Sequence, residues 1–134
     1  MAAIAVTDAH ALIWYGLGRH RKLGRRAKAL FERAEAERAA IYVPTIALVE
    51  VGEATWSGAI TLQGGFSAWA HALFSSGHFF SVDLTREIVE LAQTLYAIPE
   101  RGDRLIAATA AYLQCPLISR DATVAAVAGI DVVW

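Results

Sequence analysis

Short apolar segments that stop at an acidic residue constrain the fold of this chain more than any other feature. Residues 3–7 read AIAVT and are followed directly by Asp8, and residues 116–119 read PLIS and are followed one residue later by Asp121. Uncharged segments of this length are typical of strands buried on both faces of a parallel sheet. Segments with a helical spacing of apolar residues lie between them. This alternation predicts an α/β fold with helices on both faces of a mostly parallel sheet.

The boundaries of the predicted elements follow from apolar spacing and from Gly, Pro and Thr at segment ends. The predicted strands lie at residues 3–7, 41–43, 79–82, 116–119 and 130–134. The predicted helices lie at residues 9–16, 25–39, 45–58, 61–75, 85–97, 103–113 and 121–127. Pro99 and Gly102 are expected in the loop before the helix at 103–113. A chain of 134 residues favours one domain, residues 1–134, with a sheet of four to five strands around one core.

The composition excludes proteins that are stabilised by disulfide bonds and proteins that span a membrane. Cys115 is the only cysteine, so no disulfide can form within the chain, which fits a reducing compartment. No apolar run is long enough to span a membrane, and the apolar N-terminal stretch is too short and lacks the basic start of a signal peptide. We therefore expect a cytoplasmic protein with no membrane partner.

Basic residues are concentrated in one part of a chain whose net charge is only −1. Of the 12 Lys and Arg residues, eight lie between Arg19 and Arg38. A basic rim beside an acidic pocket fits a phosphodiester substrate, whereas the alternative is an ordinary solvated helix face. The candidate contact residues are Arg19, Arg21, Lys22, Arg25 and Arg26.

Three acidic residues occupy positions that a parallel sheet would bring together. Ligands of open α/β sheets bind outside the carboxyl ends of the strands. Asp8 and Asp121 follow the first and fourth predicted strands, and they face one crevice if these strands are neighbours. Asp103 opens the helix that leads back into the fourth strand, so it lies at the same edge. The alternative for each is the common role of an Asp that caps a helix.

Glu50 is a fourth candidate because it lies in the middle of a predicted helix, on a small and mostly apolar face. Its neighbours at helical spacing are Ile46, Ala47, Glu53 and Ala54. Such a carboxylate either reaches solvent or binds something. Clustered carboxylates require a compensating cation, and ligands that are all oxygen favour Mg²⁺ or Mn²⁺ over zinc. Such a metal polarises a phosphoryl oxygen and lowers the pKa of an attacking water.

Other chemistries on a similar sheet fit less well. Phosphoryl-transfer switches and haloacid-dehalogenase-type phosphatases need a late Lys, but Lys22 and Lys28 are both early. Those phosphatases also need a second Asp at the position of His10. No glycine-rich nucleotide loop is present, and no nearby His marks Ser119 or Cys115 as a nucleophile.

Four segments, in this order and spacing, carry a family resemblance. They are TDAHALIW at 7–14, PTIALVEVGEATWSGAITL at 44–62, RGDRLIAATA at 101–110 and LISRD at 117–121. Together they resemble the PIN-domain family, and most closely its VapC-type toxins of bacterial toxin–antitoxin pairs. The resemblance covers essentially the whole chain and implies a Rossmann-like PIN fold and a metal-dependent endoribonuclease.

The resemblance also implies roles for particular residues. Asp8, Glu50 and Asp103 match the main Mg²⁺ or Mn²⁺ ligands, and Asp121 matches an outer or second-metal ligand. Ser119 is expected to orient a carboxylate or a water, and the basic residues named above are expected to contact RNA. The loop PERGD is shorter than in close relatives, which we interpret as the loss of an accessory acid. His10 matches the family pattern but is not expected to be a ligand.

The partners implied by the resemblance are an antitoxin and a second copy of this chain in a homodimer. The antitoxin would place a C-terminal arm in an apolar groove, for which the alternative is plain core packing. The candidate groove residues are Trp14, Leu17, Leu30, Val49 and Trp56. A second class of function stays open, in which the domain is a non-catalytic PIN-like module that binds RNA or protein.

Overall fold

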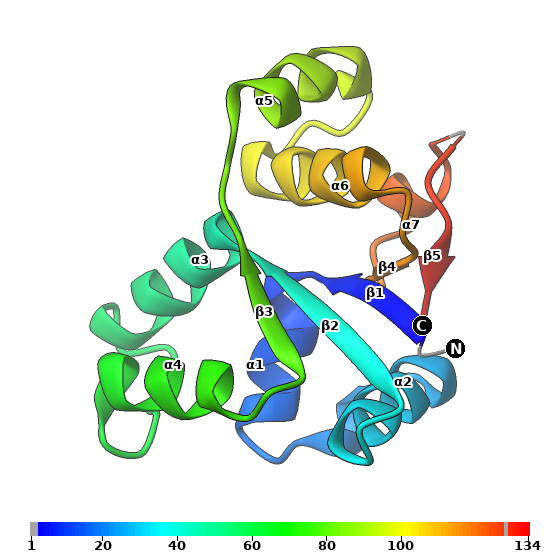
Figure 1. Cartoon of the computed structure of the whole chain (residues 1–134). Coiled ribbons are helices and arrows are strands. Elements are labelled where there is room, and N and C mark those ends of the chain that lie inside the picture. The colour runs from blue at the N-terminus through cyan, green and yellow to red at the C-terminus, as the bar shows by residue number, and fades with distance from the viewer. Residues whose placement is uncertain (1–2, 128) are drawn as a thin grey trace.

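A five-stranded, all-parallel sheet forms the centre of the computed structural model, which describes residues 3–127 and 129–134 (Figure 1). The strands are β1 (Ala3–Thr7), β2 (Ala39–Pro44), β3 (Phe79–Val82), β4 (Leu117–Ile118) and β5 (Val132–Val133). The predicted α/β class and the predicted parallel sheet are confirmed. Residues 1, 2 and 128 of the expected domain lie outside the described residues.

The strand order β3-β2-β1-β4-β5 creates a switch point beside β1. The chain builds the sheet outward from β1 through β2 to β3 and then returns to the other side of β1 for β4 and β5. At such a point the connections leave in opposite directions and open a crevice at the carboxyl ends of the strands. The predicted neighbourhood of the first and fourth strands is thus confirmed, through the pairs Val6–Leu117 and Thr7–Ile118.

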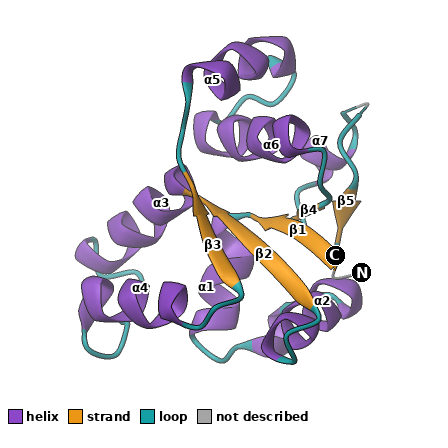
Figure 2. Ribbon diagram, in the orientation of Figure 1, coloured by secondary structure: helices purple, strands orange, loops and turns teal. Residues whose placement is uncertain are grey.

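Seven α-helices surround this sheet in the described part of the chain. They are α1 (Ala9–Gly16), α2 (Arg25–Glu35), α3 (Thr45–Trp56), α4 (Gly65–Ser75), α5 (Arg86–Ala92), α6 (Arg101–Leu113) and α7 (Ala122–Ala125). Figure 2 shows α5 and α6 on one side of the sheet and α1 and α2 on the other. Fully buried Leu12, Phe31, Ile41, Ile106 and Ile118 join helices and strands in one core.

Helices α2, α3 and α4 are shorter than predicted because the backbone turns into left-handed conformations at their ends. The chain leaves α2 through Glu37, whose φ is 61°, and residues 39 and 40 join β2 because they pair with β1. Gly58, with a φ of 84°, follows α3. Gly64 and Gly65, with φ values of 79° and 88°, delay the start of α4 to Gly65. The predicted bounds 25–39, 45–58 and 61–75 are therefore wrong at these ends.

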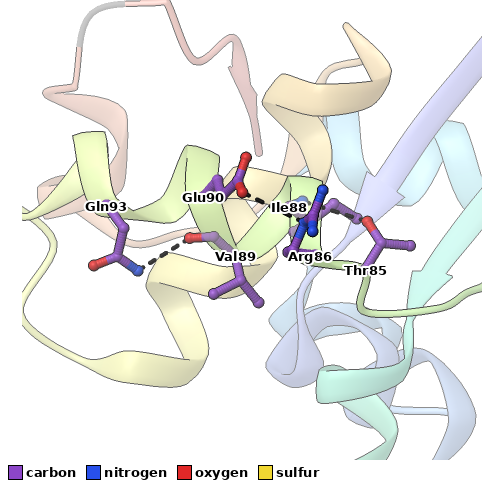
Figure 3. A network of polar contacts seen from close by, with 6 residues as sticks. All are labelled: Thr85, Arg86, Ile88, Val89, Glu90 and Gln93. Carbon is purple, nitrogen blue, oxygen red and sulfur yellow. Dashed lines mark hydrogen bonds and ion pairs between the residues drawn. The ribbon is translucent and has the colours of Figure 1, made fainter.

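Helix α5 is capped at one end and tightens at the other, so it is shorter than the predicted 85–97. The Thr85 hydroxyl accepts a hydrogen bond of 3.3 Å from the Ile88 N–H, and Arg86 pairs with Glu90 at 3.5 Å (Figure 3). The Gln93 side chain donates to the Val89 carbonyl at 3.0 Å. Residues Gln93–Leu95 then form a 3-10 turn, which ends the α-helix.

The C-terminal elements are also shorter than predicted. β4 pairs with β1 only over Leu117–Ile118 rather than over the predicted 116–119, and β1 ends at Thr7, opposite Ile118. β5 pairs only over Val132–Val133 instead of 130–134, and α7 ends at Ala125 instead of residue 127. A further 3-10 turn, His20–Lys22, interrupts the basic loop between α1 and α2.

Helix α6 begins earlier than predicted, at Arg101. Its N-cap is Glu100, whose Oε2 accepts a hydrogen bond of 2.6 Å from the Asp103 N–H. Gly102 therefore lies in the first turn of the helix, and its interpretation as a loop residue is wrong. In the described ranges, no helix is both long enough and apolar enough to cross a membrane.

Candidate active site

The switch point beside β1 holds a pocket of about 190 Å³ that is lined by carboxylates, a cation and aromatic rings. The Asp8 N–H donates to the Ile118 carbonyl at 3.1 Å, which ties the end of β1 to the end of β4. The pocket is lined by Asp8, His10, Trp14, Asp103, Arg120, Asp121 and Trp134. Three of the four acids predicted from the sequence therefore meet here.

Asp8 is the N-cap of α1, which is the structural role that the sequence offered as the alternative to metal binding. Its Oδ1 accepts a hydrogen bond of 2.8 Å from the Ala11 N–H, and the residue is only 9% exposed. Burial raises the pKa of Asp8, while the bonds to the Ala11 N–H and the Ser119 side chain lower it. The cap uses one carboxylate oxygen and fixes the orientation of the other, so capping and ligand binding are compatible.

Asp103 and Asp121 lie close enough to influence each other's charge. The pKa of Asp103 is raised to about 6, first by burial, then by the Glu100 charge and by a hydrogen bond to Asp121. Asp121 caps α7 by accepting from the Thr123 N–H at 2.8 Å, and its own N–H donates to the Ser119 hydroxyl at 3.1 Å. The Ser119 side chain therefore bonds to the Asp8 carboxylate and to the backbone N–H of Asp121, and its orienting role stays a prediction.

Glu50 reaches the acids from α3, although it does not line the same pocket. Its Oε1 is buried and has no hydrogen-bond partner among the described residues. The pKa of Glu50 is raised to about 7, first by burial and then by the charges of Glu100, Asp103 and Asp8. A methyl group on Gly102 would lie 1.9 Å from this Oε1, so the carboxylate occupies the space that glycine leaves free.

Glu100 is an acid of the site that the sequence reasoning missed. Its charge is the largest electrostatic cause of the raised pKa of both Glu50 and Asp103. The interpretation that the PERGD loop lacks an accessory acid is therefore wrong. An available signal was the spacing of Glu100 and Asp103, which matches that of a helix N-cap and the residue whose N–H it accepts.

Arg120 is the second residue that was missed, and it is the cation that lines the acidic pocket. Its guanidinium lies 4.8 Å from the centre of the Trp14 ring and 6.0 Å from that of Trp134. Of the predicted basic residues, the structure brings Lys22 to the same Trp14 ring, at 5.8 Å. Arg26 instead lines a separate hollow, and Arg19, Arg21 and Arg25 are exposed.

The five predicted groove residues do not form one surface. Trp14 lines the acidic pocket, Leu30 lines the hollow of Arg26, and Leu17 packs against the core. Val49 and Trp56 do share an apolar hollow on α3 and α4, where Trp56 is 79% exposed. The expectation of a single groove is wrong because these residues lie in or directly after three different helices, α1, α2 and α3, and do not line one common hollow.

The fit of the site to a divalent metal depends on the placement and on the chemistry of its carboxylates. As placed, no group of three or more His, Cys, Asp or Glu side chains in the described ranges could hold a metal ion. The chemistry of the donors nevertheless fits Mg²⁺ or Mn²⁺, since Mg²⁺ is often held by one or two carboxylates together with water. The buried, unpartnered Glu50 oxygen and the raised pKa values show that these carboxylates are unfavourable as bare anions, a charge that either a proton or a cation can compensate.

This chain is an open α/β protein with an all-parallel sheet and with carboxylates at its switch point. Proteins of this class bind their ligands at the carboxyl ends of the strands. Within this class, the family model described as PIN domain matches residues 5–130. The chain therefore belongs to the PIN-domain family.

Solved structures with the same fold come from several bacteria. A chain of VapBC2 from Rickettsia felis, bound to a promoter DNA fragment, matches with a TM-score of 0.72 and 13% identity over 97% of both chains. A toxin–antitoxin complex from Klebsiella pneumoniae matches with a TM-score of 0.63 and 21% identity, covering 97% of this chain and 96% of that one. FitAcB from Neisseria gonorrhoeae matches with a TM-score of 0.58 and 17% identity, covering 96% and 95%. These identities show the fold alone. No curated protein matches the chain.

Proposed function

We propose that this PIN domain is a divalent-metal-dependent endoribonuclease that acts as the VapC-type toxin of a toxin–antitoxin pair. The observation that carries the proposal is the buried Glu50 Oε1, which has no hydrogen-bond partner among the described residues and is close to other acids. A buried carboxylate of this kind is unfavourable unless a cation or a proton compensates its charge. A hard divalent metal supplies that compensation and is the cofactor of the proposed reaction.

The four acids have different roles in this proposal. Asp8, Glu50 and Asp103 would hold Mg²⁺ or Mn²⁺, with Asp121 as an outer ligand. When bound, such an ion provides a Lewis acid for a phosphoryl oxygen and lowers the pKa of water. Asp8 and Asp121 are held in place by their caps and by Ser119, so their oxygens are oriented before substrate arrives.

The RNA strand would be drawn to the pocket by the basic loop and the start of α2. Arg19, Arg21, Lys22, Arg25 and Arg26 stay candidates for this role, and Lys22 lies beside Trp14 of the pocket. Such contacts should weaken as salt rises. The proposal places the reaction in the cytoplasm, where RNA and an antitoxin are made.

An antitoxin is the proposed protein partner, and a homodimer is the proposed assembly. The support comes from neighbours of the same fold, one described as VapBC2 and one as a toxin–antitoxin complex. On this chain, the exposed Val49 and Trp56 on α3 offer an apolar surface that a helical or extended arm could cover. We assign this surface to the antitoxin.

A non-catalytic module that binds RNA or protein is the second candidate. One observation favours it: in the described ranges, the acids are not already arranged as a group that could hold a metal. The two candidates differ in whether metal produces cleavage.

The test is an RNA cleavage assay with purified protein that is free of any antitoxin. A mixed pool of structured RNA is incubated with Mg²⁺, Mn²⁺ or EDTA, and Asp103→Asn is run in parallel. Asp131→Asn is the matched control, because Asp131 lies before β5, at the opposite end of that strand from the pocket. We expect discrete cuts that need metal, persist in Asp131→Asn and vanish in folded Asp103→Asn. Metal-independent cuts, or cuts that persist in Asp103→Asn, would refute the assignment.

A further inference from the structure

Two cations from distant parts of the chain meet on one aromatic ring at the acidic pocket. Arg120 follows β4 and Lys22 ends the 3-10 turn before α2, yet both lie over the Trp14 ring, at 4.8 and 5.8 Å from its centre. Trp134 also packs against Trp14, with ring centres 5.7 Å apart, and lies 6.0 Å from the Arg120 guanidinium. At these distances the guanidinium is within the range of cation–π attraction to both indoles.

Arg120 is not neutralised by the acids that share its pocket. Ion pairs with N–O distances up to 4.0 Å occur between Lys28 and Glu32 and between Arg86 and Glu90. Within the described ranges, Arg120 forms no such pair, although Asp8, Asp103 and Asp121 line the same pocket. A guanidinium that forms no ion pair keeps its N–H donors available for another anion.

We propose that Arg120 and Lys22, gathered on Trp14, form a phosphate-binding site that holds a backbone phosphate of the RNA strand beside the acids. That the ligand is RNA rests on the proposed function, whereas the site itself rests on the placement of the two cations. The guanidinium fork binds two phosphate oxygens at once, and the ammonium of Lys22 adds a point charge. Because Arg120 forms no ion pair with the acids among the described residues, their carboxylates stay free for metal.

The site is tested by the salt dependence of RNA binding, which does not require cleavage. A fluorescein-labelled single-stranded oligoribonucleotide of mixed sequence is titrated with protein in EDTA at several salt concentrations. Each lost phosphate contact makes the negative slope of log Kobs against log salt shallower by about 0.7 for a single strand. We expect this loss of steepness for Arg120→Gln and for Lys22→Gln, and about twice this loss for the double variant.

Two further variants separate a phosphate contact from a general effect of charge or folding. Arg86→Gln removes one positive charge from the exposed face of α5, and it should leave affinity and slope unchanged. Arg120→Lys keeps the charge but lacks the fork, so it should keep the slope while binding more weakly. Thermal unfolding of each variant confirms that the folded protein is being compared.

The outcomes distinguish this site from the nuclease proposal. Slopes that stay unchanged in folded Arg120→Gln and Lys22→Gln would overturn the phosphate site even if the protein cuts RNA. Slopes that become shallower as expected would support the phosphate site even if no metal-dependent cleavage is found. In that case the nuclease proposal alone would fail. If unmodified protein does not bind the oligonucleotide at low salt, the phosphate site is overturned.

Discussion

Gly102 and Glu50 together explain how a carboxylate oxygen comes to be buried at the edge of the acidic pocket. The Glu50 Oε1 occupies the space in which any side chain at position 102 would place its first carbon, 1.9 Å away. Among the described residues it finds no hydrogen-bond donor there. The absence of a side chain at Gly102 is thus a requirement of the site rather than of a turn, since this residue lies inside α6.

Gly102→Ala should therefore displace the Glu50 carboxylate and weaken metal binding. The added methyl group cannot coexist with Oε1 in its present position, so α3, α6 or the carboxylate has to move. Titration with Mn²⁺ followed by calorimetry measures the affinity, which we expect to fall by about tenfold or more, as for lost supporting groups of metal sites. Gly52→Ala is the matched control, because a methyl group there meets nothing within 4 Å. In a helix this control should be stabilising by about 0.5–1 kcal/mol.

The same residue predicts an unusual pH dependence for the metal-free protein. The pKa of Glu50 is about 7 in the folded chain against an ordinary value of 4.5, so the folded state holds this proton more tightly than the unfolded state. The free energy of unfolding should then decrease as pH rises from about 4.5 to about 7, and Asp103 adds to the decrease up to about 6. Thermal unfolding in EDTA across this range measures it.

Glu50→Gln provides the control for that pH dependence. The neutral amide removes the group whose ionisation is unfavourable in the folded state, so the variant should be more stable than the unmodified protein near neutral pH and should show a flatter profile. Parallel profiles for the two proteins would show that burial of Glu50 does not govern the effect.

At the scale of elements, α6 brings Asp103 to the site and ends in a strained residue. Its C-cap is Gln114, with φ 55° and ψ 43°, a left-handed conformation that glycine adopts more readily. Gln114→Gly should raise the free energy of unfolding by about 0.5–1 kcal/mol in urea denaturation. Gln93→Gly places glycine at a right-handed position after α5, with φ −64°, and should be destabilising, because glycine has no advantage there and the side-chain hydrogen bond to the Val89 carbonyl is lost. Equal effects of the two substitutions would contradict the assignment of strain to Gln114.

At the scale of the whole molecule, the proposed metal should link separate elements and stabilise the fold. Asp8 follows β1, Glu50 lies on α3, Asp103 on α6 and Asp121 before α7, so the complete donor set exists only in the folded chain. A metal that binds the folded state alone adds about 2.7 kcal/mol at a concentration of 100 times Kd.

Thermal unfolding with and without Mn²⁺ measures this linkage. The midpoint should rise with Mn²⁺ for the unmodified protein and for Asp131→Asn, and the rise should shrink in Asp103→Asn. Addition of EDTA should reverse it. A midpoint that does not respond to metal would favour the non-catalytic binding module over the proposed nuclease.

The sequence alone determined the class of fold and the convergence of Asp8, Asp103 and Asp121 at one edge of the sheet. Uncharged strands such as residues 3–7 favour a sheet that is covered on both faces, and helical segments between strands favour parallel connections. In β1 the prediction of burial holds for Ala5, Val6 and Thr7, whereas Ile4 is 42% exposed. Asp8 and Asp121 could be predicted to converge because each follows a strand, and parallel strands end at one edge. These inferences depend on local patterns, which a sequence shows directly.

Only the tertiary structure decided which side chains reach the site from outside those patterns. The spacing of Glu100 and Asp103 indicates a helix cap but not a contact with Glu50, and nothing in the local sequence of Arg120 distinguishes it from a surface residue. Their roles depend on the packing of α3 against α6 through Gly102 and on the meeting of Trp14 and Trp134, residues far apart in the chain. Burial and the distances between charges set the electrostatics of the pocket, and both are properties of the folded arrangement rather than of the order of residues.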